Sequence, residues 1–468
     1  MDEAYAWAAE QYGAAELGDL RRTVRLVELA AACARKPGGV VTGVSLSSAQ
    51  REGAYRFLES KKVDNEAVAA PMFAATARRC AGDAILVVSV DQATISFVDR
   101  QRTKQLGRTA TRSETYARRG FQVMNALGVR ADGESAGLLA QQWYVRREED
   151  TPEEKHWKRP FEERESFLWF RCIKAVSEVL KVHAPRIRPW LQMDRGADSG
   201  DLMQATLALG DTDFTIRSNA NRTLLGGGHL HDAVRASASL GRVRIAIPSR
   251  LPQAGMPRVR HALFALRACR LHVQLNNSHG RHRDVLPLTA VHVREVATGR
   301  RKPIEWTLLT NRTVDGLEAA LQVVTNYRSR WRVEEFHRAW KSGVCCVEQS
   351  QLRSASALRR WATILAAVAT RAEQLKSLSR AKPLAPATEE LSTEELDAIG
   401  VLSRVNNIKC FEKGEVPSLE RAVEQIALLG GYTGRRNSGG PPGATTIQRG
   451  LHDVLIAAAA IAAVARSG

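Results

Sequence analysis

The segment from Tyr327 to Lys341 carries side chains that suit phosphate chemistry. On a helix that advances about 100° per residue, Tyr327, Arg330 and Lys341 lie within about 60° of Glu334. One helix face therefore presents a carboxylate together with two cations and a phenol. A metal-binding acid does not need those cations, whereas a phosphate bound beside it does. The alternative is an exposed helix with i,i+4 ion pairs, but the tryptophans and phenylalanine of the segment favour a half-buried helix.

Two further acids follow short apolar runs that are typical of buried strands. Asp91 follows residues 84–90, and Asp194 follows residues 190–193. We expect each to close its strand at the rim of a sheet. Two-metal phosphodiester chemistry needs carboxylates from separate elements that converge on cations about 3.5–4 Å apart. Strand-end aspartates often only cap turns, so the case for a metal site depends on a third acid. Glu334 is favoured for this role over Glu335, which lies about 100° off the cationic face.

The elements around these acids predict an α/β class with three domains. Strands are expected at 122–129 and 137–145, and helices at 166–182, from 317 past 341, at 355–379, near 418–429 and at 447–464, with a linker around 381–395. Residues 206–313 read as β-rich and hold 17 Lys and Arg against 6 Asp and Glu, which suits a nucleic-acid surface. The predicted division is a helical domain at 1–65, a catalytic domain at 66–370 with its β-rich insertion at about 206–313, and a helical domain at 371–468.

The N-terminal region is predicted to be helical at 14–35 and 52–58. Arg21, Arg22 and Arg25 gather on the first of these helices. A solvated helix face explains the cluster as well as a DNA contact does.

Charge and cysteine usage narrow the class of protein. The 468 residues carry a formal net charge of +18 and a pI of about 10.0, which favours a polyanionic partner. Seven scattered cysteines match neither a CxxC metal site nor a secreted disulfide framework. The first residues lack the layout of a secretion signal, and the apolar run 454–465 is shorter than a membrane span. We therefore expect a cytoplasmic, nucleoid-associated protein with no membrane partner.

The spacing Tyr327-x2-Arg330-x3-Glu334-x6-Lys341 resembles the signature of the bacterial DDE insertion-sequence transposases of the Tn-five type. Further similarities occur in the same order across nearly the whole chain: LGDLRRTVRL at 17–26, EGAYRF at 52–57, MDRGAD at 193–198, FTIRS at 214–218 and WTLLT at 306–310.

This resemblance implies a ribonuclease-H-like catalytic domain and a role for each matching residue. Asp91, Asp194 and Glu334 would be the DDE ligands of two Mg²⁺ ions, for which Mn²⁺ would substitute. Contacts to the DNA would come from Tyr327, Arg330 and Lys341, from Arg217 and Arg222 of the β-rich insertion, from Trp306, which would stack on a flipped base, and from Arg21, Arg22 and Arg25, which would read the transposon end.

Four departures from the family pattern stand out. Gln92 and Ala93 replace two threonines, so a hydroxyl beside Asp91 would have to come from Thr94 or elsewhere. Asn219 replaces a lysine, and Met124 replaces a histidine. The loop near 147–156 is longer than in the family.

The resulting hypothesis is a cut-and-paste transposase that acts on double-stranded DNA as a homodimer and pairs through its C-terminal region. It would nick one strand, form and resolve a DNA hairpin, and join the 3′-OH to target DNA. Two alternatives are a domesticated DNA-binding protein or inhibitor and a ribonuclease-H-like nuclease or resolvase. The three acids argue against the first, and the phosphate-binding helix face and long C-terminal region argue against the second.

Overall fold

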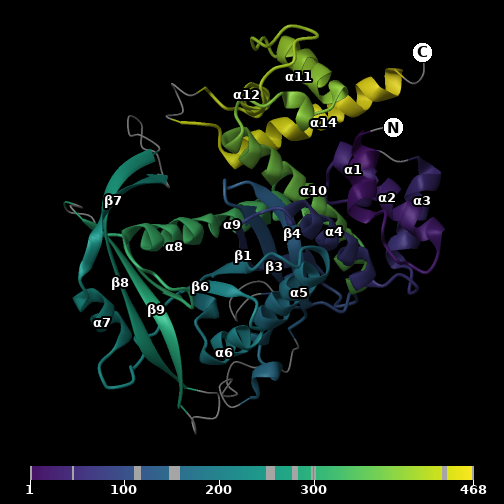
Figure 1. The fold of residues 1–468 in the computed structure, drawn as a ribbon. Helices are drawn as coiled ribbons and strands as arrows, with labels where there is room; N and C mark the ends of the chain where they lie inside the picture. The colour runs from purple at the N-terminus through teal and green to yellow at the C-terminus, as the bar shows by residue number, and fades with distance from the viewer. Residues whose placement is uncertain are drawn as a thin grey trace.

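The computed structural model describes residues 3–44, 47–109, 118–146, 159–248, 259–276, 283–296, 299, 302–434 and 440–465. Its first elements are helical (Figure 1). They are α1 (Glu3–Tyr12), α2 (Leu20–Arg35), the 3₁₀ helix η1 (Val41–Gly43), α3 (Ser48–Glu59) and α4 (Asn65–Cys80). Helix α2 begins later than predicted because Gly18 adopts a positive φ of 70° and Asp19 caps the helix by accepting the Arg21 N–H. Helix α1 was not predicted.

A mixed sheet of ten strands forms the centre of the chain and confirms the α/β class. Its order is β2-β3-β1-β5-β6-β10-β9-β8-β7, with β4 paired to β3. The strands of the first half are β1 (Leu86–Val98), β2 (Gly107–Arg108), β3 (Arg118–Arg130), β4 (Ser135–Tyr144), β5 (Pro189–Met193) and β6 (Asp213–Arg217). Strands β1 and β3 are antiparallel, whereas β1, β5 and β6 run parallel.

One face of this half is covered by helices that connect its strands (Figure 1). They are α5 (Phe167–His183) and α6 (Gly200–Ala208), with the short 3₁₀ turns η3 (Phe161–Glu163) and η4 (Arg195–Ala197). The buried residues Cys172, Ile173 and Val176 of α5 pack on Val88 and Val90 of β1 in one apolar cluster. Alternation along β1 therefore directs Asp91 to the opposite face.

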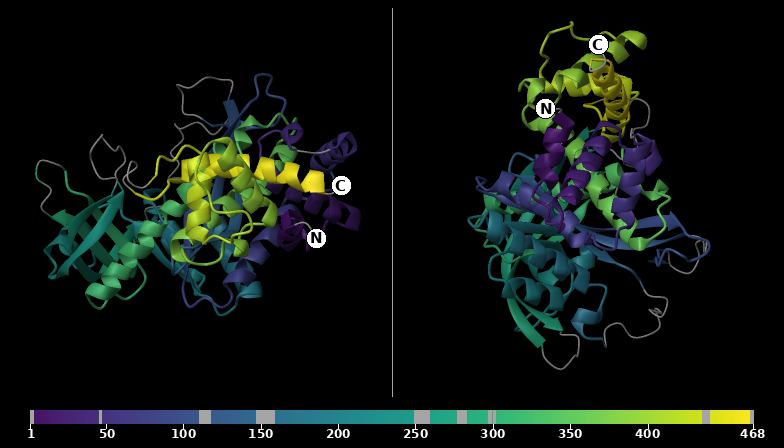
Figure 2. Two further views of the ribbon diagram at one scale, coloured as in Figure 1. Left: turned by 90° about the horizontal axis from the view of Figure 1, so that it is seen from above. Right: turned by 90° about the vertical axis from the view of Figure 1, so that its right-hand side faces the viewer.

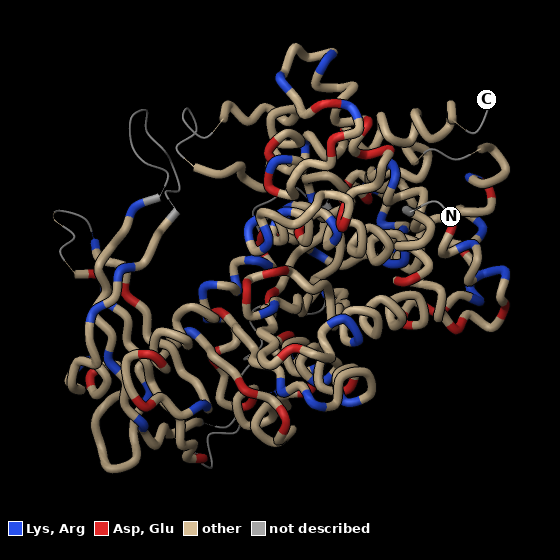
Figure 3. Tube along the Cα trace, turned by 45° about the horizontal axis from the view of Figure 1, so that its top comes forward, with Lys and Arg blue, Asp and Glu red and all other residues tan. Residues whose placement is uncertain are grey.

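The region predicted to be β-rich continues the same sheet rather than forming a separate one. It comprises α7 (Leu230–Ala236), β7 (Ser239–Pro248), β8 (Val259–Asn276), β9 (Arg283–Val296) and β10 (Glu305–Thr310). Strands β6 and β10, both inside the predicted insertion, pair with each other in the central sheet. Basic positions recur along β7, β8 and β9 in Figure 3.

Two helices cross the other face of the sheet and carry the signature segment. They are α8 (Leu317–Ser329) and α9 (Trp331–Lys341), which meet at Arg330. After the 3₁₀ turn η5 (Val347–Gln349), the 27-residue helix α10 (Ala355–Ala381) runs through the core with most of its side chains buried.

The C-terminal elements pack beside α10 and the N-terminal helices (Figure 2). They are η6 (Ala387–Glu389), α11 (Thr393–Val405), α12 (Leu419–Leu429) and α14 (Ala444–Ala465). The predicted linker at 381–395 is partly wrong, because η6 lies within it and Ser392 caps α11 through a reciprocal pair of hydrogen bonds with Glu395. Helix α11 was not predicted.

Helix α14 is longer than the predicted apolar run. It has 22 residues and is, in the described part of the chain, the one helix long and apolar enough to cross a membrane by length and composition. Leu451, Val454 and Leu455 are nevertheless buried in the same apolar cluster as residues of α10 and α12. One side of α14 therefore packs in the core, while 39% of its apolar window is buried in all.

Candidate functional site

Asp91 and Asp194 lie on neighbouring parallel strands at matching positions. The pairing of β1 with β5 ends at Ser89 and Gln192, which are register partners. Asp91 and Asp194 each follow two residues later, so the two carboxyl groups leave the same edge of the paired region. Asp194 caps the turn after β5 by accepting the Gly196 N–H at 2.7 Å.

The expectation that Asp91 closes its strand is wrong. Strand β1 continues seven residues beyond it to Val98, because the antiparallel pairing with β3 extends along the whole of β1. The same alternation contradicts the idea that Thr94 could provide a hydroxyl beside Asp91. Thr94 points to the opposite face and donates to Gln122 Oε1 at 2.8 Å.

Glu334 reaches the site from the first turn of α9, and Arg330 joins it to Asp91. The Arg330 guanidinium donates from Nη1 to Asp91 Oδ2 at 3.0 Å and from Nη2 to Glu334 Oε1 at 2.6 Å. The side chains of Arg330 and Asp91 are only 13% and 15% exposed. Helix α9 thus places its acid and its first cation over β1, as the signature segment requires.

The pKa of Asp91 is raised to about 6, mainly by burial. Arg330 opposes this increase, while the negative charges of Asp194 and Glu334 contribute to it. Asp194 and Glu334 therefore both act electrostatically on the Asp91 carboxyl group. A carboxyl group with a raised pKa beside other acids is typical of functional sites.

The donor set fits a divalent cation, but the ligands do not surround a common point. Three carboxylates are hard oxygen donors of the kind that Mg²⁺ and Mn²⁺ prefer. Among the described residues, however, no three acidic, histidine or cysteine side chains are gathered closely enough to hold a metal ion. Asp91 and Glu334 instead share the guanidinium of Arg330.

A group of aromatic and basic side chains adjoins the acids. Tyr327 is buried, and its ring meets that of Trp306 edge-on with 5.6 Å between centroids. The guanidinium carbon of Arg217 lies 5.9 Å from the centre of the Trp306 ring. Burial lowers the pKa of Arg217, and the nearby cations Arg195 and Arg330 lower it further. These residues, which the sequence predicted as DNA contacts, lie together on the same face as Arg330.

Two other predicted contacts are engaged elsewhere. Lys341 lies at the far end of α9, where its Nζ is 3.7 Å from Glu348 Oε1. Arg222 forms an ion pair of 2.5 Å with Asp198, whose side chain is 1% exposed. Asp198 also accepts the backbone N–H groups of Asn219 and Ala220, so this pair fixes the loop after β6 beside Asp194.

The three N-terminal arginines lie on the first turns of α2. Arg21 is 92% exposed at the side chain and pairs with Asp19 at 3.1 Å. Arg22 donates to the Leu17 carbonyl at 2.7 Å, and Arg25 pairs with Glu28 at 3.0 Å. They lie on a helix separate from the acids, and Arg21 is the most accessible of them.

Sequence reasoning missed a buried hydrogen-bond chain that holds α9 against the sheet. Asn125, the register partner of Asp91, lies 3.1 Å from His337 Nε2 and accepts from Gln141 at 2.8 Å. Gln141 in turn accepts from Thr363 of α10 at 3.1 Å. The available signal was the spacing of His337 from Glu334, which puts it nearly on the same helix side.

Glu335 has a structural partner set of its own. It lies 3.2 Å from Arg332 and 2.9 Å from Lys376, whose side chain is 1% exposed. Burial opposes ionisation, but Lys376 and Arg332 together lower the pKa of Glu335. This acid therefore anchors α9 to α10 and leaves Glu334 to face Asp91.

The comparison with known families concerns the N-terminal helices. Residues 4–63 match the family model described as transposase DNA-binding. The match covers most of α1 and all of α2, η1 and α3, including the arginines on α2. This region is therefore similar to transposase DNA-binding domains, which indicates a transposase with DNA as its partner.

Proposed function

We propose that the chain is a cut-and-paste DNA transposase of the DDE type, which binds inverted-repeat ends, excises them and joins them to target DNA. The observation that carries the proposal is that Arg330 joins Asp91 to Glu334, with Asp194 near enough to act on the Asp91 carboxyl, in a chain whose N-terminus matches a transposase DNA-binding model. Binding alone does not require three interacting, partly buried acids.

The strand order supports a ribonuclease-H-like catalytic domain. Strands β1, β3 and β4 form an antiparallel meander, β5 and β6 continue in parallel on the other side of β1, and the acids lie on the central strand, at the end of its neighbour and on a later helix. On this proposal β7, β8 and β9 are the inserted part.

Asp91, Asp194 and Glu334 would hold two Mg²⁺ ions, which when bound activate the attacking oxygen and stabilise the leaving one. Arg217, Arg330 and Tyr327 would bind and orient the DNA phosphates beside the acids. Trp306 would stack on a base displaced from the duplex, which offsets part of the cost of unpairing.

Each step exchanges or hydrolyses one phosphodiester. Water first cuts one strand and leaves a 3′-OH. That hydroxyl attacks the opposite strand and forms a hairpin, water then opens the hairpin, and the 3′-OH finally attacks target DNA and releases a target 3′-OH. One P–O bond forms as another breaks in every step, so no nucleotide cofactor is required.

The proposal predicts that Asp91→Asn, Asp194→Asn and Glu334→Gln each lower cleavage by at least about 10³-fold and leave end binding intact. Each change removes a negative oxygen donor with little change in volume, while the basic surfaces remain. Cleavage gels with Mg²⁺ and gel-shift assays with the terminal repeats of the element measure both. Glu394→Gln, on an exposed position of α11, is the matched control.

Two outcomes would redirect the proposal. Full cleavage by any of the three variants would remove that residue from the site. Cutting by the unmodified protein without joining of 3′-OH ends to a target plasmid would favour a nuclease or resolvase instead.

A further inference from the structure

Arg330 occupies a position that neither an exposed ion pair nor a simple phosphate contact explains. Its two terminal nitrogens are used separately, one on Asp91 at 3.0 Å and one on Glu334 at 2.6 Å. The side chain is only 13% exposed. The guanidinium therefore lies between two of the three acids that the proposed function assigns to the metal ions.

The charges around the site account for this position. Asp91 is 15% exposed at its side chain, and the negative charges of Asp194 and Glu334 both act on it. A guanidinium with several fixed donors can neutralise two carboxylates at once. A divalent cation would need the same oxygens, so the guanidinium and the metal compete for them.

A second environment for the guanidinium adjoins the first. Arg330 interacts with Tyr327, and near it lies Arg217, whose pKa is lowered first by burial and then by the charges of Arg195 and Arg330. A DNA phosphate in this place would attract all three arginines. The Arg330 backbone is ordinary α-helix, with φ −50° and ψ −32°, so a change of side-chain rotamer alone could transfer the guanidinium.

We propose that Arg330 is an internal counter-ion that keeps the metal site closed in the free protein and opens it when a DNA phosphate draws the guanidinium away. This inference rests on the proposed metal-dependent function. It accounts for the position of the guanidinium between Asp91 and Glu334 at 3.0 and 2.6 Å. It also requires metal and DNA to favour each other's binding, since both displace the same bridge.

The first test is a calorimetric titration of the full-length, DNA-free protein with Mn²⁺. Arg330→Ala and Arg330→Gln should bind Mn²⁺ at least about tenfold more tightly than the unmodified protein, because the competing cation is gone. Arg332→Ala is the matched control, since Arg332 lies on the same helix but pairs with Glu335. It should bind Mn²⁺ as the unmodified protein does.

Thermal unfolding gives a second measurement on the same variants. In EDTA, Arg330→Gln should unfold at a lower temperature than the unmodified protein, because its acids are left without a counter-ion. Mn²⁺ should raise the unfolding temperature of Arg330→Gln more than that of the unmodified protein. Equal shifts would contradict the inference.

The third measurement addresses DNA. Fluorescence anisotropy with a labelled, 5′-phosphorylated duplex is compared with and without Mn²⁺, and the Asp91→Asn/Asp194→Asn double variant corrects for Mn²⁺ on the DNA itself. Mn²⁺ should tighten DNA binding by the unmodified protein at least about fivefold and have no such effect on Arg330→Gln. Equal tightening in both would overturn the coupling.

The outcomes separate this inference from the proposed function. Equal Mn²⁺ affinity of the unmodified protein and both Arg330 variants, with binding abolished by Asp91→Asn, would leave the metal site in place and refute the role of Arg330. Absence of any Mn²⁺ binding that depends on Asp91 would refute the metal site, and with it both proposals.

Discussion

His337 lies one turn after Glu334 and is held in its neutral form by its surroundings. The pKa of His337 is lowered to about 3, mainly by burial and in smaller part by the charges of Lys341 and Arg330. The neutral ring accepts from Asn125 at 3.1 Å, and Asn125 in turn accepts from Gln141, which accepts from Thr363. Protonation would remove that acceptor and place a charge in the core beside two cations.

The folded protein should therefore lose stability as the pH falls below 6.5. The unfolded histidine takes up a proton near pH 6.5 and the folded one only near pH 3, so the stabilisation is complete above 6.5 and declines at up to about 1.4 kcal/mol per pH unit. Between pH 7.0 and pH 5.5 the free energy of unfolding should fall by about 1 kcal/mol less in His337→Gln than in the unmodified protein, as measured by urea unfolding. An identical loss in both would exclude His337 as the sensitive group.

Substitution of Arg222 and Arg217 should distinguish an arginine that stabilises the fold from one that binds DNA. Arg222→Ala leaves the buried Asp198 without its cation and should lower the free energy of unfolding by about 3 kcal/mol. Arg217 packs on Trp306 and faces the acids, so Arg217→Ala should change stability by under about 1 kcal/mol but weaken DNA binding. Urea unfolding and gel shifts measure both, and equal destabilisation would contradict this division.

At the scale of elements, Trp306 lies in the part of strand β10 that does not pair with β6. Only Leu308, Leu309 and Thr310 pair with β6, whereas Trp306 pairs with Val293 of β9 and packs on Tyr327. The ring is half-buried. One part of the indole therefore supports α8, and the rest remains accessible beside the acids.

Trp306→Ala should slow hairpin formation more than the first nick, by about tenfold or more. Only the second step requires a displaced base, and stacking contributes about 1–3 kcal/mol per base. Gel analysis of reaction intermediates should show nicked DNA accumulating. Equal slowing of both steps would assign Trp306 a packing role.

The sequence predicted the elements that periodicity and composition mark clearly. Strand β5, helix α5 and helix α10 were predicted to within about two residues, because apolar runs and caps define them. The pattern that ends at Asp91 did not reveal that β1 continues to Val98, since the later residues are polar on one face. Helices α1 and α11 were not predicted, because their burial depends on other helices: α2 and α4 for α1, and α12 and α14 for α11.

The candidate site was predictable as a set of residues but not as an arrangement. The spacing of Arg330 and Glu334 fixed their common helix face, and the structure adds that Arg330 also reaches Asp91, 239 positions earlier. The chain through Asn125 could not be predicted, because it depends on strand register. The ion pair of Arg222 with Asp198 could not be predicted either, because it joins two loops that follow different strands.

At the scale of the molecule, α14 has one buried side and one exposed side. The buried side includes Leu451 and Val454, and the exposed side carries Ile456, Ala460 and Val464. Deletion from Leu451 onward would therefore remove core residues as well as the exposed side. It would not provide a clean test of the proposed homodimer.

Charged substitutions on the exposed side of α14 provide a better test of the homodimer. Ala460→Arg with Val464→Glu should leave a folded protein that binds single ends but does not pair two of them, because charges disrupt a small-residue, two-fold contact. Val405→Arg, on an exposed position of α11, is the control. Light scattering with end DNA and cleavage gels measure pairing, and normal two-end complexes would exclude this side of α14 as the interface.

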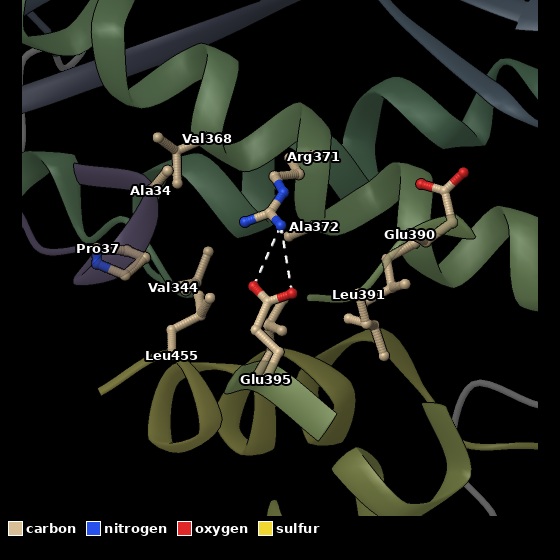
Figure 4. A pocket seen from close by; sticks show the side chains of 12 residues that line it. Ala34, Pro37, Val344, Val368, Arg371, Ala372, Glu390, Leu391, Glu395 and Leu455 are labelled. Atoms are coloured by element: carbon tan, nitrogen blue, oxygen red, sulfur yellow. Dashed lines mark hydrogen bonds and ion pairs between the residues drawn. The ribbon is translucent and has the colours of Figure 1, made fainter. Parts of the chain in front are cut away.

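A small pocket shows how closely the two terminal regions meet. It is lined by Ala34 and Pro37 from the end of α2, by Leu455 of α14, and by residues of α10 and α11 (Figure 4). Arg371 and Glu395 pair across it at 3.1 Å. A shift of α14 would therefore alter the contacts of residues at the C-terminal end of α2.

The docking of the N-terminal helices on α10 sets an order in time for the growing polypeptide. The Tyr12 hydroxyl donates to the Thr363 carbonyl at 3.4 Å, and the Trp361 indole donates to the Gly39 carbonyl at 2.7 Å. During synthesis the first 63 residues leave the ribosome long before α10, on which they dock, has been made. A chain that stops short of α10 would carry residues 4–63, which match the transposase DNA-binding model, without the helix on which they dock. Only a chain that already includes Glu334 can complete that docking.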